Sequence, residues 1–196
     1  MGRMIGSSSI SFDKPPFIIE GASIVGQKEG DGPLGKLFDV VEQDPMLGQE
    51  TWEEAESLLQ KEAIQKLLFK AGMSKEEIRY IFGGDLLGQL IATTFGILEF
   101  EVPFFGLYGA CSTMGEALSL GAVMVEAGNA DNVIAMASSH FASAERQFRF
   151  PLAYGNQRPY AATWTVTGCG AVIISTKKGF AKITGITTGK IVDFGV

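Results

Sequence analysis

The stretch VPFFGLYGACST at residues 102–113 runs from an apolar segment through a Gly-Ala-Cys turn. Residues 102–108 are typical of a short strand, and residues 112–127 are apolar on nearly every side until Gly128 ends the run. A helix without a polar face has to be covered on several sides, so we expect 112–127 to form a buried central helix. This order indicates an α/β fold with Cys111 where the strand passes into the helix.

The rest of the chain supplies the other elements of such a fold. Further strands are expected at 17–25, 80–82, 132–138, 165–175 and 181–188, where β-branched and small apolar residues predominate.

A capping box of Thr51 and Glu54 begins a run of apolar residues at helical spacing that ends at Gly72. It predicts an amphipathic helix over 51–71 that covers a sheet. Residues 26–50, apart from one helical turn near Leu37, and residues 143–162 show no sustained period and are expected to be long loops.

Composition limits the classes of protein to be considered. With 196 residues and 46% apolar content, the chain is long enough for one packed core, so residues 1–196 are expected to form a single domain. A net charge of -6 argues against binding to nucleic acid. No apolar run is long enough to span a membrane, and no secretory signal pattern opens the chain. Two cysteines make no disulfide framework, so a reducing cytoplasm is expected.

Cys111 is the first candidate for chemistry. A cysteine in the first turn of a helix lies near unpaired N–H groups and the positive end of the helix dipole, which favour a nucleophilic thiolate. Free cysteine is also one of the most frequently buried residue types, and composition alone leaves both interpretations open. Cys169 lies between two glycines in an expected strand and is interpreted as structural.

Polar residues around the strand at 132–138 are further candidates. His140 is the only histidine and follows the carboxyl end of this strand, where open α/β sheets bind ligands. It could orient a ligand or act as an acid or base, although a hydrogen-bonded core histidine is the more common case. Ser139 and Asp131 are weaker candidates, and Asp131 fits a turn equally well.

Three arginines, Arg146, Arg149 and Arg158, lie among four aromatic residues in the expected loop. Guanidinium groups next to rings suit a planar carboxylate, which they bind by paired hydrogen bonds and stacking. Ion pairs with the many acidic residues are the alternative. The sequence contains no zinc-ligand spacing and no phosphate-binding glycine fingerprint.

Three stretches carry a resemblance to a known family: FFGLYGACSTM at 104–114, ASSHF at 137–141, and ERQFRFPLAYGNQRPYAATWTVTG at 145–168. The first, with the helix and the AGNADNVI segment at 127–134, resembles the nucleophile region of the thiolase and ketoacyl synthase superfamily. All three together resemble the stage V sporulation protein AD family of endospore-forming bacteria. The resemblance implies a thiolase-like layered fold with a mixed sheet, of which this chain is the N-terminal half.

The same resemblance implies a function. Members of this family are the dipicolinic acid binding component of a spore membrane system that takes up dipicolinate, usually with calcium, in sporulation and releases it in germination. Its partners are membrane proteins, so a peripheral place on the cytoplasmic side of the spore inner membrane is implied. No cofactor is required, calcium travels with the ligand, and a homodimer is expected.

Three hypotheses remain open from the sequence. The leading one is a binding module, without catalysis, in which Cys111, His140, Ser139, Asp131 and the three arginines line the ligand site. The alternative is an acyltransferase with Cys111 as nucleophile. Two departures from the enzymes argue against it: Met114 is bulky after the cysteine, and His140 stands where many thiolases carry an acid. A structural scaffold for membrane partners is the third hypothesis.

Overall fold

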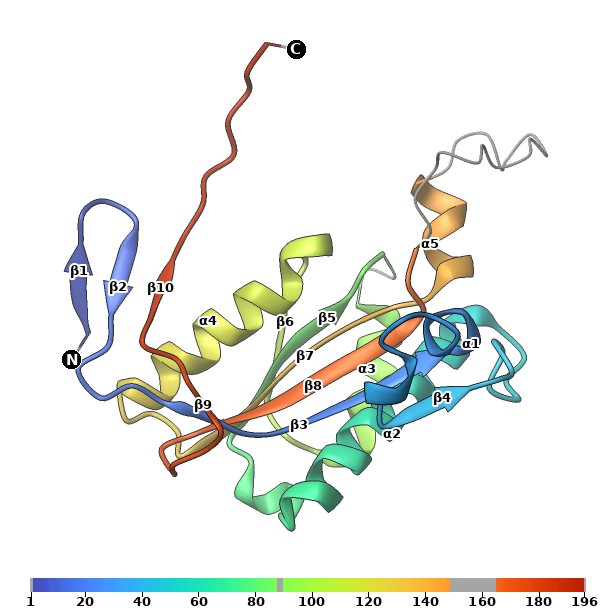
Figure 1. The fold of residues 1–196 in the computed structure, drawn as a ribbon, viewed down its shortest axis with the longest axis horizontal. Helices are drawn as coiled ribbons and strands as arrows, with labels where there is room; N and C mark the ends of the chain where they lie inside the picture. Colours follow the sequence, from blue (N-terminus) through green and yellow to red (C-terminus); the bar gives the residue numbers. More distant parts are fainter. Residues whose placement is uncertain (1, 88–89, 149–164, 196) are drawn as a thin grey trace.

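The computed structural model describes residues 2–87, 90–148 and 165–195, with the side chains at 145–148 excepted. Its centre is a mixed seven-stranded sheet (Figure 1). The strands lie in the order β4 (Val40–Glu42), β3 (Phe17–Gly26), β8 (Gly168–Ser175), β7 (Asn132–Ser139), β5 (Tyr80–Asp85) and β6 (Phe104–Gly106), and β9 (Ala181–Lys182) pairs with β3. β5, β6 and β7 are parallel, whereas β8 is antiparallel to both of its neighbours.

Helices cover both faces of this sheet. α2 (Trp52–Ala71) and α3 (Ile91–Ile97) pack on one face, and α4 (Thr113–Glu126) packs on the other (Figure 1). The shorter helical segments are α1 (Gln27–Gly30), α5 (Phe141–Phe148), η1 (Gly35–Leu37), η2 (Lys75–Glu77), η3 (Leu98–Phe100) and η4 (Ala110–Ser112). None of the described helices is both long and apolar enough to cross a bilayer.

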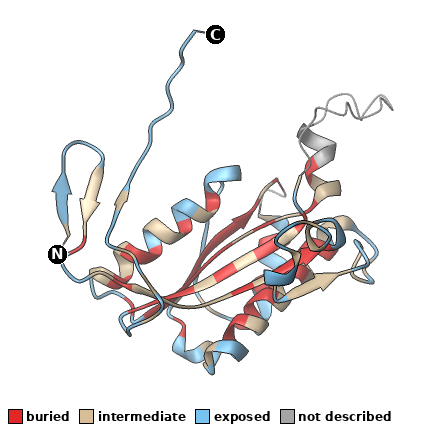
Figure 2. Cartoon of the chain, viewed as in Figure 1, coloured by how far each residue is buried: buried red, intermediate tan, exposed pale blue. Residues whose placement is uncertain are grey.

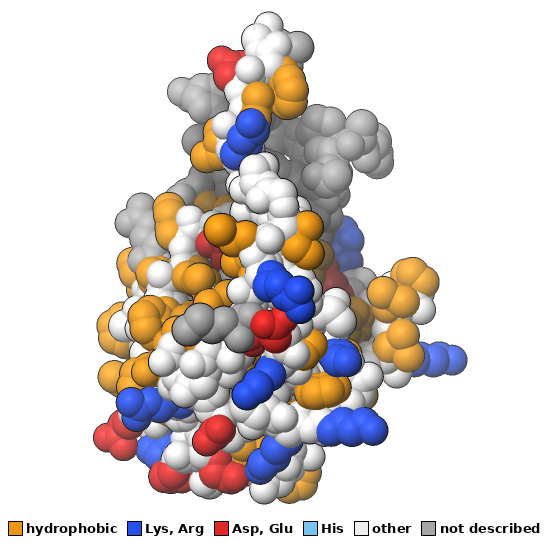
Figure 3. Space-filling model, turned by 90° about the vertical axis from the view of Figure 1, so that its left-hand side faces the viewer, with side chains coloured by type: hydrophobic (Ala, Val, Ile, Leu, Met, Phe, Trp, Pro, Cys, Tyr) orange, Lys and Arg blue, Asp and Glu red, His pale blue; other side chains and the backbone are white. Residues whose placement is uncertain are grey.

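A second, antiparallel sheet lies at one end of the molecule. It contains β1 (Arg3–Ile5), β2 (Ser9–Ser11) and β10 (Gly185–Thr187), and the C-terminal tail extends away from it (Figure 1). On the face of the molecule that Figure 3 shows, basic and acidic side chains are mixed with hydrophobic ones rather than gathered by sign.

The predicted capping of α2 is confirmed. The Glu54 amide donates to the Thr51 hydroxyl at 3.2 Å, the Thr51 amide donates to the Glu54 carboxylate at 3.0 Å, and Gly72 ends the helix in the left-handed region. The buried face of α2 then supplies much of the core, with Leu59, Ala63, Ile64 and Leu67 fully enclosed. Each enclosed large aliphatic side chain contributes about 1.5–3 kcal/mol of burial free energy.

Strand alternation divides the core into two layers. Along β7, Ile134 and Met136 point toward α2, while Val133 and Ala135 point toward α4. Figure 2 shows the buried positions concentrated in these central strands and in the inward sides of the helices. Residues two apart on a strand therefore share a face, which decides below which site residues can meet.

Several expectations about local structure were wrong. The 112–127 segment is a helix, but Leu120 is 44% exposed, because α4 packs one side on the sheet and no described segment covers the other. The helix α5 begins at Phe141, so the described part of the expected 143–162 loop, residues 143–148, is helical; the remainder lies outside the described residues. The 26–50 segment was expected to be a loop but contains α1 and the parallel strand β4, whereas η1 confirms the helical turn expected near Leu37.

Candidate functional site

Cys111 lies in η4, the turn that joins β6 to α4, and its side chain is exposed. The preceding residue, Ala110, has a φ of 49°, in the left-handed region that alanine seldom occupies. A Cβ on Gly109 would meet the ends of the exposed Ser112 and Glu116 side chains, so a larger residue at this position would have to displace them. A non-glycine residue in the left-handed region is strained, and such strain is common at functional sites. Here it occurs directly before the exposed thiol of Cys111.

Cys111 opens onto a cleft of about 560 Å³ at the carboxyl end of β5 and β7. The lining residues are mostly small or apolar: Ser23, Val25, Phe38, Leu86, Ala110, Cys111, Ala137, Ser138, Ser139, Thr165, Val166, Gly168, Cys169 and Gly170. This volume lies within the range of small-molecule sites. None of these side chains carries a charge, so any charge that binds an ionic ligand has to come from residues outside this lining.

Alternation along the strands explains the floor of the cleft. Ser23 of β3, Ala137 and Ser139 of β7, and Gly168 and Gly170 of β8 belong to the α4 side of the sheet. A Cβ on Gly170 would meet no atom within 4 Å, which shows how open the floor is. Because α4 covers β5 and β7 more than β8, it leaves this part of the face free next to Cys111.

His140 does not reach this cleft. It is one strand position away from Ser139, so it points to the opposite face, where its side chain is fully buried against the rings of Trp52 and Phe141. Its Nε2 lies 2.8 Å from the Pro45 carbonyl oxygen, and its Nδ1 accepts from the Ala142 amide at 3.2 Å. Burial lowers the pKa of His140, and a neutral ring with the proton on Nε2 satisfies both bonds.

The other predicted ligand residues are dispersed. Asp131 is exposed at the opposite end of β7 from Ser139, roughly 26 Å along the strand at the usual rise per residue. Arg146 belongs to α5, but its side chain is not among those described. Arg149 and Arg158 lie outside the described residues. Of the predicted set, the structure brings together Cys111 and Ser139.

A buried polar network lies behind the cleft, on the α2 side of the sheet. Glu56 is 1% exposed and accepts hydrogen bonds from the hydroxyls of Ser138, at 2.7 Å, and Ser143, at 3.1 Å. Burial, together with the charges of Asp85 and Glu53, raises the pKa of Glu56 to about 7, although the two hydroxyl bonds act in the opposite direction.

The network continues through Gln60 to β5. The Gln60 amide donates to the hydroxyls of Ser138, at 2.6 Å, and Thr93, at 3.1 Å, and Thr93 in turn donates to Asp85 at 2.7 Å. This network was not predicted from the sequence. Its signal was present, because Glu56 and Gln60 occupy the apolar stripe of α2 together with Leu59.

Cys169 confirms the structural interpretation of the second cysteine. It is 2% exposed and packs in the core on the α2 side of the sheet. Burial, and then the nearby Glu56 carboxylate, raise the pKa of its thiol far above the ordinary value, so it stays protonated.

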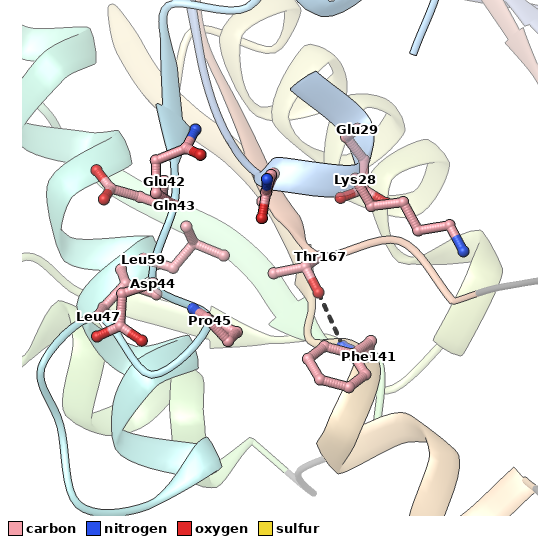
Figure 4. Close-up of a pocket in the computed structure, with 12 residues that line it drawn as sticks. Lys28, Glu29, Glu42, Gln43, Asp44, Pro45, Leu47, Leu59, Phe141 and Thr167 are labelled. Carbon is pink, nitrogen blue, oxygen red and sulfur yellow. Dashed lines mark hydrogen bonds between the residues drawn. The ribbon is translucent and has the colours of Figure 1, made fainter. Parts of the chain in front are cut away.

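A smaller cavity of about 170 Å³ lies between α1, β4 and the start of α5. Figure 4 shows Glu42, Gln43 and Asp44 on one side of it and Lys28 and Glu29 on the other. Phe141 and Thr167 also line this cavity, and the Phe141 amide donates to the Thr167 hydroxyl at 3.0 Å (Figure 4). Within the described ranges, no group of three or more His, Cys, Asp or Glu side chains is placed to hold a metal ion.

The mixed sheet between helical layers, with the exposed Cys111 where α4 begins, has a thiolase-like fold. Two solved structures share this fold: 3-oxoacyl-[acyl-carrier-protein] synthase III from Aquifex aeolicus VF5 (TM-score 0.55, 18% identity, 82% of this chain and 53% of that one), and beta-ketoacyl-[acyl carrier protein] synthase III from Thermus thermophilus (TM-score 0.55, 16% identity, 81% and 51%).

Sequence comparison defines the family more narrowly. The model of the family described as Stage V sporulation protein AD matches residues 6–196, and this chain belongs to that family. It is 40% identical over 194 residues to the Stage V sporulation protein AD of Bacillus subtilis (strain 168). The match covers 99% of this chain and 57% of that protein, so the chain spans little more than half the length of this relative.

Proposed function

We propose that this chain binds dipicolinate in the spore membrane system that takes up the ligand in sporulation and releases it in germination. The observation that carries the proposal is the open cleft beside Cys111, whose small residues leave room for a flat ring. Membership of the Stage V sporulation protein AD family supports the biological setting.

The charge for a dicarboxylate would come from Arg146, Arg149 and Arg158. These residues belong to the sequence between Ser139 and Thr165, two residues that line the cleft. Arginine pairs with carboxylates through two parallel hydrogen bonds. Cys111 and Ser139 would contact the ligand, whereas His140 would position the junction of β7 and α5 from behind.

The remaining features of the proposal follow the family. The chain would be the N-terminal half of a duplicated thiolase-like fold, would form a homodimer, and would lie at the cytoplasmic side of the spore inner membrane beside membrane protein partners. Calcium would arrive with the ligand. Net charge -6 disfavours a role with nucleic acid.

Calorimetric titration of dipicolinate into the full chain tests this proposal. Cys111→Trp places a large ring in the mouth of the cleft and is expected to weaken binding at least tenfold. Leu120→Trp places the same ring at an exposed position of α4 that does not line the cleft, and it is the matched control that should retain binding. Absence of binding by the wild-type chain, or equal affinity in both variants, would overturn the proposal.

An acyltransferase is the second candidate, and the exposed thiol at the start of a helix favours it. In this reaction the Cys111 sulfur would attack the carbonyl carbon of an acyl-CoA, forming a new thioester and releasing coenzyme A as its thiol. Mass spectrometry after incubation with acyl-CoA would show the added acyl mass on Cys111. No adduct over several acyl lengths would exclude this candidate.

A further inference from the structure

The Glu56 carboxylate lies directly behind the wall of the Cys111 cleft. Ser138 connects the two, since it lines the cleft and its hydroxyl donates to Glu56 at 2.7 Å on the other side of the sheet. Ser143, which also donates to Glu56, lies in the first turn of α5, the helix that leads to the arginine segment. One buried carboxylate therefore contacts both the end of β7, which lines the cleft, and the first turn of the helix that follows it.

The hydrogen bonds around Glu56 suit either protonation state. The Ser143 hydroxyl lies 3.1 Å from the Glu56 carboxylate and also 3.1 Å from the His140 carbonyl oxygen. When Glu56 is ionised, Ser143 can donate to the carboxylate. When Glu56 is protonated, its O–H can donate to Ser143, and Ser143 can turn to the His140 carbonyl. Glu56 can therefore bind or release a proton while its carboxyl group and Ser143 keep their hydrogen bonds.

The charged and titratable groups around Glu56 are acidic or neutral. Asp85 of β5 and Glu53 of α2 add negative charge, Cys169 of β8 is a protonated thiol, and His140 is a neutral ring. Among the described side chains, Glu56 has no ion-pair partner. Burial is the largest cause of its raised pKa of about 7, so the group titrates in the range where a protein works.

We propose that Glu56 couples proton uptake to the binding of an anionic ligand in the Cys111 cleft. This inference rests on the proposed function. A charge behind the wall repels a ligand that carries two carboxylates, and a proton on Glu56 removes that repulsion. By thermodynamic linkage, the bound anion must in turn raise the proton affinity of Glu56. Glu56 does not touch the ligand in this arrangement; it acts through its charge, from behind the wall that Ser138 helps to form.

Calorimetric titration of dipicolinate into the full chain at pH 6 and pH 8, in two buffers of different ionisation enthalpy, tests the coupling. Both ligand carboxyls are ionised at these pH values. Wild type is expected to bind on the order of fivefold more weakly at pH 8 than at pH 6 and to take up a proton near pH 7. Glu56→Gln, which stays neutral, should bind equally at both pH values and take up none. Glu50→Gln, at an exposed carboxylate, is the matched control and should behave as wild type.

The outcomes separate this inference from the proposed function. Binding that is equally strong at pH 6 and pH 8 in wild type would overturn the coupling while leaving the dipicolinate site in place. A pH dependence that persists in Glu56→Gln would assign it to another group and overturn the role of Glu56. No binding at either pH would overturn both proposals. Infrared difference spectra of the ligand-free chain provide an independent check, since the protonated carboxyl signal should vanish in Glu56→Gln.

Discussion

Replacing Glu56 by glutamine should change how the stability of the chain depends on pH. In the native state its pKa is about 7, against 4.5 for an unperturbed glutamate. Between these values the folded chain holds a proton on Glu56 that the unfolded chain has released. The stabilisation of the folded chain by protonated Glu56 is therefore fully present below about pH 4.5 and is lost as the pH rises through 7.

The size of the effect follows from the two pKa values. A tenfold change in proton affinity corresponds to about 1.4 kcal/mol, so the whole interval corresponds to roughly 3 kcal/mol. Glutamine resembles the protonated acid, because its oxygen can accept from Ser138 while its amide donates to Ser143. We therefore expect the free energy of unfolding of Glu56→Gln, relative to wild type, to be roughly 2–3 kcal/mol higher at pH 8 than at pH 5, so that the variant gains stability relative to wild type as the pH rises.

Urea denaturation at the two pH values, followed by circular dichroism, measures this difference directly. Glu50→Gln, at an exposed carboxylate, should show no such change with pH and serves as the control. If the stability difference between Glu56→Gln and wild type were the same at pH 5 and pH 8, Glu56 would not titrate in this interval and the reasoning would fail.

Three further predictions concern the fold and the thiols. Leu59→Ala leaves a cavity in the core and should lower the free energy of unfolding by about 2–5 kcal/mol in urea denaturation, whereas Phe69→Ala, at an exposed position of the same helix, should change it little. Thr51→Ala removes the cap of α2 and should cost about 1 kcal/mol in the same assay; no loss would mean that the capping box is not needed. A thiol reagent should label Cys111 rapidly in the native chain and Cys169 only after unfolding, as mass spectrometry of the labelled peptides would show; early labelling of Cys169 would contradict its burial.

Much of the fold could be predicted because its signals are local. The Thr51 and Glu54 box and Gly72 fix the ends of α2 through groups a few residues apart, and the structure has the same boundaries. The strand at 132–138 and the helix after Cys111 also form as expected, from apolar runs of the right length. The three-residue strand β4 could not be predicted, because its pairing with β3 is a long-range contact that leaves little trace in so short a segment.

The candidate site was predicted in part. Cys111 at the start of the central helix was correct, because a strand, a glycine turn and a helix are all visible along the chain. His140 was expected beside it, but a strand turns successive side chains to opposite faces, so Ser139 reaches the cleft while His140 is enclosed behind it. The burial of Glu56 was not predicted, because an acidic residue on a helix usually faces water.

The sequence by itself therefore determined most elements of this protein, its α/β class and the place of Cys111 just before a helix, because capping, periodicity and turn residues act over a few positions. Only the tertiary structure decided which side chains meet. Because successive side chains of a strand point to opposite faces, Ser139 faces the cleft and His140 faces the core. The packing of α2 against the sheet placed Glu56 behind Ser138, which is 82 residues away in the chain. Contacts of that separation depend on how whole elements pack, which no local pattern encodes.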